Sequence, residues 1–239
     1  RLLSRGLGDV YKRQVLNFKK NHIGFSCNSQ PTKISVFSNG SIEFIGTEGQ
    51  TLNYSRNTKV NGTNVQFTQL KKEKDGLIAS SNIQGLEKTF SVMFNSLKYN
   101  YVLNNAISYS GPNFVIEEEL FLPQGSKIIK DPIIGKEDDL GWVGPLLIKD
   151  VNNKELGSLG GVMCYDANQD YVLAGYEIIE NNGKKRIKIN IPSTWLNHPN
   201  RAYPVTIDPL VTGPTSTYAG PLIPSCISPA TGVDSILVT

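Results

Sequence analysis

Histidine and cysteine are scarce in this 239-residue chain, which contains two histidines and three cysteines. His22 and His198 lie far apart, and no serine stands in the G-x-S-x-G turn that presents a hydrolase nucleophile. The glycine-rich loops that bind phosphates in nucleotide-binding proteins are also missing. These absences predict a protein that is not an enzyme and that requires no cofactor.

The cysteines Cys27, Cys164 and Cys226 show no C-x-x-C spacing, which argues against a structural zinc site. In an oxidising compartment Cys27 and Cys164 can form a disulfide, which stabilises a fold by closing a long loop. The alternative, which we favour, is that both are small buried hydrophobic residues. Cys226 then requires a partner beyond this segment.

Long hydrophobic runs are missing too, so no membrane span is predicted. The net charge of +3 comes from residues 1–14, which hold four basic residues and one acidic residue and leave 20 of each sign in the remainder. A nucleic-acid-binding protein carries a basic stripe on its surface. The balanced charge therefore excludes nucleic acid as a predicted partner.

The two ends of the chain differ from its middle. Residues 1–14, RLLSRGLGDVYKRQ, resemble a translated sequencing-adapter junction, and we interpret them as an artefactual or disordered tail. The alternative is a genuine basic arm. Near the other end, Pro209, Gly213 and Pro214 predict a boundary, because proline cannot continue a central strand. We therefore expect a domain over 15–210, followed over 211–239 by a linker and the truncated start of another β domain.

What the sequence does contain is a series of short segments in which apolar and polar residues alternate. Ten tyrosines, nine phenylalanines and 22 glycines suit strands joined by tight turns, and Asn39-Gly40 favours such a turn. No window shows the apolar spacing of an amphipathic helix. We predict strands at 32–38, 41–46, 63–70, 86–94, 97–104, 113–123, 145–150, 157–166, 171–180, 185–192 and 202–209.

This pattern predicts an all-β fold, a large antiparallel two-sheet sandwich with little or no helix. Residues 124–144 are predicted to form one long loop around Trp142. Long loops in compact domains often carry function. The alternative is a crossover whose tryptophan packs on the sheet edge.

The segment over 195–209 reads WLNHPNRAYPVTIDP. Its prolines fix the entry turns, and Tyr203, Val205 and Ile207 share one face of the last strand. We expect Arg201 to pair with Asp208 or with another nearby carboxylate. The segment is therefore predicted to close the fold, with Pro209 ending the strand ladder.

The pattern W-L-x-x-P-x-R-x-Y-P-V-x-I-D-P resembles the end of N-terminal β domains in large secreted and cell-wall bacterial proteins. Those proteins include ones with Rhs-type repeats or DNRLRE-type surface modules, and 208–214 and 224–226 are similar to surface proteins that carry a C-terminal sorting domain. The resemblance covers about residues 77–239 and implies an exported, multidomain, cell-surface or extracellular protein. It brings no catalytic residues.

Acidic residues offer the possible sites for chemistry. Glu117, Glu118 and Glu119 lie in one predicted strand, so one face must carry a glutamate among apolar neighbours. A buried glutamate can act as an acid, although we expect solvated glutamates at a strand edge. A metal site is considered at Asp166, Asn168 and Asp170, and a cation at Glu137–Asp139, but a polar turn explains both.

The favoured function is a non-catalytic structural or adhesive module whose partners are the downstream domains of the same polypeptide. The alternative is a carbohydrate-binding module that contacts glycans or cell-surface components through exposed aromatic rings. The ring candidates are Trp142, Tyr109, Tyr54 and Tyr218. A third possibility, a glycosidase-like sandwich, requires a second carboxylate facing Glu118.

Overall fold

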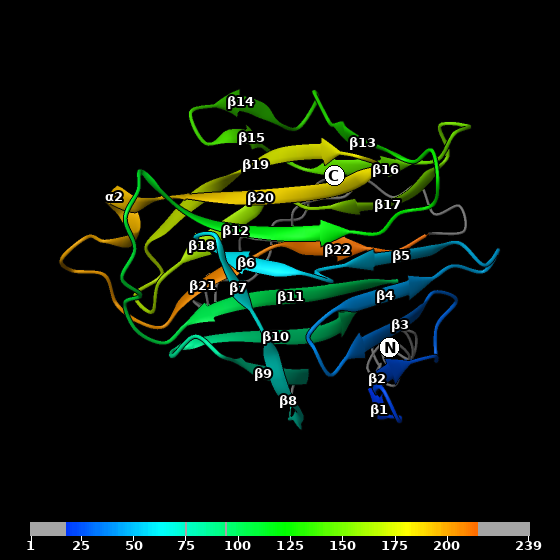
Figure 1. Ribbon diagram of the computed structural model, residues 1–239, viewed down its shortest axis with the longest axis horizontal. Coiled ribbons are helices and arrows are strands. Elements are labelled where there is room, and N and C mark those ends of the chain that lie inside the picture. Colours follow the sequence, from blue (N-terminus) through cyan, green and yellow to red (C-terminus); the bar gives the residue numbers. More distant parts are fainter. Residues whose placement is uncertain (1–17, 75, 94, 215–239) are drawn as a thin grey trace, which may run out of the picture.

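The computed structural model describes residues 18–74, 76–93 and 95–214. Nearly all of the regular structure in them is antiparallel β-sheet, which confirms the predicted all-β sandwich. Figure 1 shows long strands lying in layers, with the N-terminal sheet beside one end of the larger assembly. The prediction of little helix is also confirmed, since α2 (Ser193–Leu196) is a single turn.

The N-terminal sheet is an antiparallel meander in which each strand pairs with the next. The turn before its fourth strand contains Asn39-Gly40, and Gly40, with a φ of 77°, donates its N–H to the Phe37 carbonyl over 2.9 Å. The predicted tight turn therefore depends on the glycine. The strands are β1 (Lys19–Lys20), β2 (Gly24–Cys27), β3 (Lys33–Phe37), β4 (Ile42–Ile45) and β5 (Thr51–Tyr54).

The second sheet has β12 and β20 at its centre, paired in antiparallel register from Asn113↔Pro192 to Leu120↔Lys185. Across the sheet, in order, are β7 (Thr63–Val65), β6 (Thr58–Val60), β12 (Asn113–Leu120), β20 (Lys184–Pro192), β19 (Tyr171–Asn181), β15 (Gly141–Val143) and β14 (Lys136–Asp138).

The third sheet runs from β8 through β11 and then divides, because two short strands pair end to end along β11. One branch continues through β21 and β18 to the first half of β19, and the other through β22, β17 and β16 to β13. Its strands are β8 (Phe67–Glu73), β9 (Gly76–Ser81), β10 (Leu86–Met93), β11 (Ser96–Leu103), β13 (Lys127–Lys130), β16 (Leu146–Lys149), β17 (Glu155–Leu159), β18 (Val162–Tyr165), β21 (Val205–Asp208) and β22 (Leu210–Thr212).

The core lies between the second and third sheets and continues under the N-terminal sheet as one apolar cluster. Alternation along the strands produces it: Ile187, Ile189 and Ile191 of β20 are buried, as are Tyr99 and Tyr101 of β11. Because successive side chains of a strand point to opposite faces, the intervening polar residues point to the outer face of the sheet. Burying this apolar area is the main stabilising contribution to the fold.

Two sequence predictions about irregular segments are wrong. Residues 124–144 contain β13, β14 and β15 rather than one long loop, since Ile128 pairs with Ile148 and Trp142 with Tyr176. The ladder also continues past Pro209, because β22 pairs Leu210 with Lys98 and Val211 with Leu97. Proline lacks an N–H, but the residues after it resume the pairing with β11.

The segment over 195–209 does close the fold, through the guanidinium of Arg201. This group lies 3.7 Å from the centre of the Trp195 ring and donates to the Trp195 carbonyl over 2.8 and 3.0 Å. It also donates over 2.8 Å each to Asp166 and Asp170. Asp208, the other partner considered for Arg201, lies 2.6 Å from Lys98 instead.

Asp166 connects this segment to the turn before β19. One of its oxygens accepts the backbone N–H groups of Asn168 and Asp170, and the other accepts the Arg201 guanidinium and the backbone N–H of Ala202. Burial raises the pKa of Asp166, but these hydrogen bonds outweigh burial and hold it below its ordinary value. The ionised carboxylate is therefore a structural anchor.

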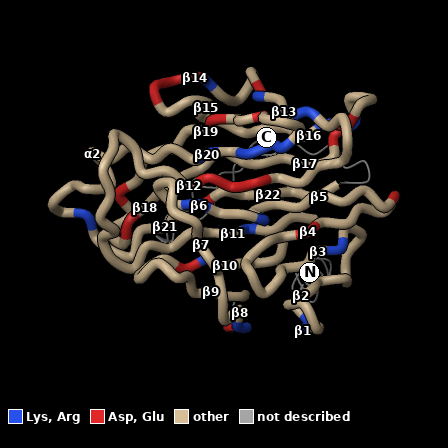
Figure 2. The backbone as a smooth tube through the Cα atoms, viewed as in Figure 1, with Lys and Arg blue, Asp and Glu red and all other residues tan. Residues whose placement is uncertain are grey.

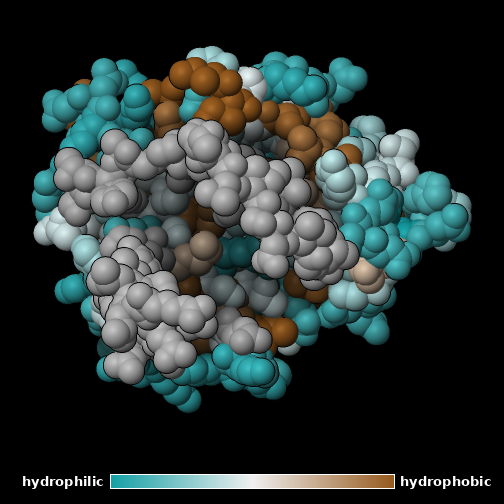
Figure 3. Space-filling view, turned by 180° about the vertical axis from the view of Figure 1, so that it is seen from behind, coloured by the Kyte–Doolittle hydropathy of each residue, from teal (hydrophilic) through white to brown (hydrophobic). Residues whose placement is uncertain are grey.

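Hydrophobic side chains also reach the surface, in groups separated by hydrophilic ones, as the face in Figure 3 shows. The most exposed of them is Ile133, at 91%, in the turn between β13 and β14. Scattered exposed apolar residues are normal on a folded protein. We therefore assign this turn no partner.

We expect Arg201→Met to lower the free energy of unfolding by about 1.5–3 kcal/mol, because a buried carboxylate loses a charged hydrogen-bond donor. Urea unfolding followed by circular dichroism measures this loss. Lys188→Met is the matched control, since Lys188 forms an exposed pair with Glu177 at 3.2 Å, worth less than about 1 kcal/mol. Equal losses in the two variants would contradict the assigned role of Arg201.

Candidate functional site

An ion pair lies inside the sandwich with no solvent exposure. Lys88 of β10, in the third sheet, places its Nζ 3.3 Å from Oε1 of Glu118, which belongs to β12 in the second sheet. Both side chains are 0% exposed. Removing two charges from water is costly, so such a pair requires close compensation from its surroundings.

Three hydroxyl groups provide that compensation to Glu118. The Tyr99 hydroxyl donates to Oε2 over 2.6 Å, and the hydroxyls of Tyr101 and Ser55 both donate to Oε1 in short hydrogen bonds. Ser55 has a φ of 56°, a left-handed conformation that is uncommon for serine. Uncommon backbone conformations of this kind concentrate at functional sites.

Lys88 is enclosed by aromatic rings. Its Nζ lies 4.4 Å from the ring centre of Tyr99, 4.8 Å from that of Tyr101, and 5.7 Å from those of Phe67 and Phe90. Apart from Glu118, its hydrogen-bond partner is the Tyr101 hydroxyl at 3.2 Å. Aromatic faces attract a cation, although more weakly than a carboxylate does.

The two charges respond differently to burial. Burial lowers the pKa of Lys88 to about 8, although the charge of Glu118 partly opposes it. Burial by itself raises the pKa of Glu118, but the charge of Lys88 and the three hydroxyl donors outweigh it and lower that pKa. The carboxylate is therefore ionised at rest, while the ammonium loses its proton more readily than an exposed lysine.

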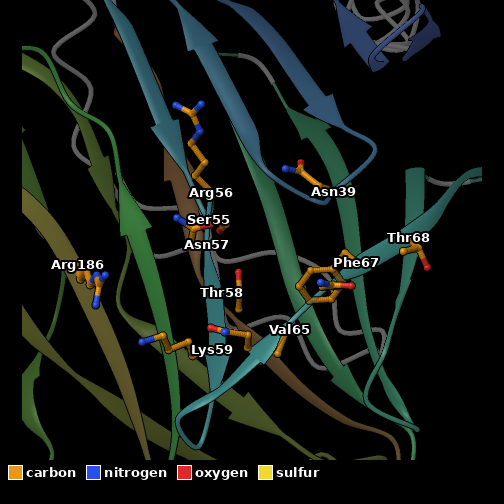
Figure 4. Close-up of a pocket in the computed structure, with 12 residues that line it drawn as sticks. Asn39, Ser55, Arg56, Asn57, Thr58, Lys59, Val65, Phe67, Thr68 and Arg186 are labelled. Carbon is orange, nitrogen blue, oxygen red and sulfur yellow. The ribbon is translucent and has the colours of Figure 1, made fainter.

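An open cavity of about 620 Å³ lies next to this cluster, beside β6 and the start of β8. Ser55 and Phe67 line it, and both also contact the buried pair. Figure 4 shows Phe67 and Val65 on one side of β6, and Lys59 and Arg186 on the other. A single layer of side chains thus separates the ion pair from the cavity.

The opposite face of β12 carries rows of paired charges. Glu117 lies 3.0 Å from Arg186 and 3.9 Å from Lys59, on the two neighbouring strands. Glu119 is also buried, where Asn57 donates to it in a short hydrogen bond and Lys184 lies 3.8 Å away. Figure 2 shows this acidic stretch of β12 beside the basic stretch of β20.

The expectation that Glu117–Glu119 are solvated glutamates at a strand edge is wrong. β12 is a central strand with β6 on one side and β20 on the other, so Glu118 points into the core. The groups that contact its carboxylate are an ammonium and three hydroxyls.

The metal candidates Asp166, Asn168 and Asp170 form a tight turn, and Asp166 directs its oxygens to backbone N–H groups and Arg201. No group of three or more metal-ligating side chains occurs in the described part of the chain. Glu137 of the acidic 137–139 stretch pairs instead with Lys130 at 2.7 Å. Turn hydrogen bonds thus engage Asp166, and an ion pair engages Glu137.

The aromatic candidates for ligand binding are dispersed. Trp142 is 6% exposed and donates its indole N–H to the Pro145 carbonyl over 2.9 Å, and Tyr54 is fully buried. Tyr109 is partly exposed, stacks edge-on against Phe114 and accepts a hydrogen bond from Asn197. Tyr218 lies outside the described residues. Among the described candidates, Trp142, Tyr54 and Tyr109 form no ring contact with one another.

Cys27 and Cys164 are buried free thiols, and Cys226 lies outside the described residues. Burial raises the pKa of Cys164, so its thiol remains protonated and behaves as a small apolar group. None of the helices in the described residues has the length and apolar character to span a membrane.

Sequence reasoning identified Glu118 and missed Lys88, Ser55, Tyr99 and Tyr101. The available signal was the position of Lys88 in a strand that otherwise alternates regularly, because Leu86, Lys88 and Phe90 share one face. A lysine on the apolar face of a strand indicates a buried charge that requires a partner. Which acidic residue serves as that partner follows only from how the sheets pack.

These features define an all-β protein of two packed sheets with an internal lysine–glutamate pair. Comparison with protein-family models, curated proteins and solved structures finds no match to this chain.

We expect Glu118→Leu to cost about 3–5 kcal/mol of unfolding free energy, because it leaves the ammonium of Lys88 buried without a counter-charge. The double variant Lys88→Met/Glu118→Leu should lose less than Glu118→Leu alone, because it leaves no unpaired charge. Urea denaturation of both variants measures the difference. Glu117→Leu, one residue away on the outer face, is the control and should change stability by less than about 1 kcal/mol. A double variant less stable than Glu118→Leu would refute the assigned pairing.

Proposed function

We propose that this chain is a non-catalytic structural or adhesive module of an exported, multidomain bacterial surface protein. The observation that carries the proposal is the closure of the sandwich by the segment over 195–209, whose pattern resembles the end of such domains. Arg201, Trp195 and Asp166 hold this segment against the sheets, and β21 lies between β11 and β18. In this proposal the polar and aromatic groups of the segment serve closure of the fold.

The contacts of the polar residues support a mechanical role. The acidic and basic groups described above pair with one another or cap turns, and the buried carboxylate of Glu118 is held by hydroxyls and by Lys88. Two sheets joined through β19 resist separation, because its two halves pair with different sheets. In this proposal the partners are neighbouring domains of the same polypeptide and components outside the cell.

A carbohydrate ligand is a second candidate, favoured by the cavity beside β6. Amides and hydroxyls suit a polyol, an aromatic side chain suits a sugar face, and basic residues suit an acidic sugar. The lining contains these groups: Asn39, Asn57, Asn64, Gln66, Thr58, Phe67, Lys59 and Arg186. The site differs from the one the sequence suggested, because Trp142 is buried elsewhere.

Surface display is the direct test of the first proposal. An epitope inserted in the exposed turn at Asn182-Gly183, between β19 and β20, should be labelled by antibody on intact cells that produce the complete polypeptide. A cytosolic protein with the same epitope should be labelled only after permeabilisation. The proposal fails if both proteins behave alike.

A glycan array tests the second candidate. Binding of any saccharide should weaken at least tenfold in Asn64→Ala, because an exposed amide that lines the cavity is lost. The control Asn182→Ala, at a turn not included in the cavity lining, should bind like the parent chain. Absence of binding to any saccharide, or equal binding by both variants, would exclude the cavity as a sugar site.

A further inference from the structure

The buried pair unites the features required for a covalent bond between its side chains. Lys88 and Glu118 have no solvent exposure, the Lys88 Nζ lies 3.3 Å from Oε1 of the carboxylate, and the two residues belong to opposite sheets. β10 pairs with β9 and β11, whereas β12 pairs with β6 and β20, so no ladder hydrogen bond connects these two strands. Only side chains connect them directly at this point.

The hydrogen bonds of Lys88 are longer than those usual for an ammonium. Charge-assisted N–H···O bonds usually measure about 2.7–2.9 Å. Those of Lys88 measure 3.2 Å to Tyr101 and 3.3 Å to Glu118, and the rest of its surroundings are aromatic rings. A neutral amine has the free electron pair that a nucleophile requires.

We propose that Lys88 and Glu118 condense to an amide, an isopeptide cross-link that joins the two sheets of the sandwich. The reaction begins when the ammonium transfers a proton to the carboxylate, which produces an amine and a carboxylic acid. The Lys88 nitrogen then attacks Cδ of Glu118, and a C–N bond forms. As this bond forms, the π electron pair of the Cδ=Oε2 bond moves onto Oε2.

The hydroxyl groups occupy the positions that this step requires. Tyr99 donates to Oε2 at 2.6 Å and stabilises the negative charge that develops there. Tyr101 contacts both Nζ and Oε1, so it can accept a proton from nitrogen while giving its own to the departing oxygen. The C–Oε1 bond breaks, Oε1 leaves as water, and the pair on Oε2 restores the carbonyl. One water is lost, and no oxidant or other reactant is needed.

The cavity provides an exit for that water. Ser55 donates to Oε1, the departing oxygen, and also lines the cavity of about 620 Å³. Its left-handed backbone, with a φ of 56°, places the hydroxyl between the buried carboxylate and the solvent-connected space. Holding two reactants in contact corresponds to effective concentrations of up to about 10⁵–10⁸ M. A reaction that occurs once per chain does not need to be fast.

The intact mass of the denatured full chain tests the proposal directly. The wild-type chain should be lighter than its sequence by one water, and digestion should yield a branched peptide that joins Lys88 to Glu118. Lys88→Met should have the full mass of its sequence. Tyr101→Phe keeps the ring but removes the relay, so a larger fraction of its chains should have the full mass shortly after synthesis.

Lys98 is the matched control within the same chain. Its Nζ lies 2.6 Å from Asp208, closer than in the proposed pair, but its side chain is 36% exposed. Lys98→Met should therefore keep the mass deficit, because water reaches the Lys98 ammonium and this pair takes no part in the proposed reaction. A wild-type chain with the full mass of its sequence overturns the proposal, whether or not the variants fold. A deficit that persists in Lys88→Met, or a branch at Lys98, overturns it as well.

Discussion

Two opposite charges without access to water constrain the interior of this protein more than any other feature. Lys88 and Glu118 can remain between the sheets only if the surrounding groups replace the hydration that both have lost. The positions of Tyr99, Tyr101 and Ser55 follow from that requirement, because each directs a hydroxyl at the carboxylate. The sheets are therefore held in register by polar contacts as well as by apolar packing.

In the closing segment, residues 195–209, hydrogen bonds likewise replace the hydration that charged groups have lost. The guanidinium of Arg201 bonds to two carboxylates and a carbonyl while its face lies on the Trp195 ring. Because Asp166 also binds the backbone of its own turn, one carboxylate fixes two segments that are distant in the sequence. The last strands are thus positioned by these charged contacts as well as by their apolar side chains, since Val205, Ile207 and Val211 are buried in the core.

Both arrangements suit a protein that must keep its shape outside the cell, which is the role we propose. Ser55 and Phe67 contact the internal pair and also line the open cavity. These two residues therefore belong both to the core and to the proposed ligand site. If the proposed amide forms, the inter-sheet contact becomes permanent and the cost of maintaining buried charges disappears. Structural and binding roles are compatible in such a module.

Much of the local structure was predictable, because alternation is a property of neighbouring residues. The strands over 86–94, 97–104, 113–123, 171–180 and 185–192 appear in the structure with bounds that differ by a few residues. The segment over 124–144 was not predictable as strands, since Ile128 and Trp142 obtain their partners from β16 and β19. Proline and glycine indicate where a chain can turn, but they do not reveal a strand that resumes, as β22 does after Pro209.

The sequence by itself determined an all-β chain with a closing segment, because side-chain period and turn chemistry are encoded locally. It also indicated that one face of the strand over 113–123 carries a glutamate among apolar residues, although solvated glutamates at a strand edge were expected. Only the tertiary structure decided that Lys88 is the partner of this glutamate and that Arg201 binds Asp166 rather than Asp208. The physical reason is that a charge pairs with whatever the packing of distant strands brings within a few ångströms, and this distance is not recorded in any local pattern.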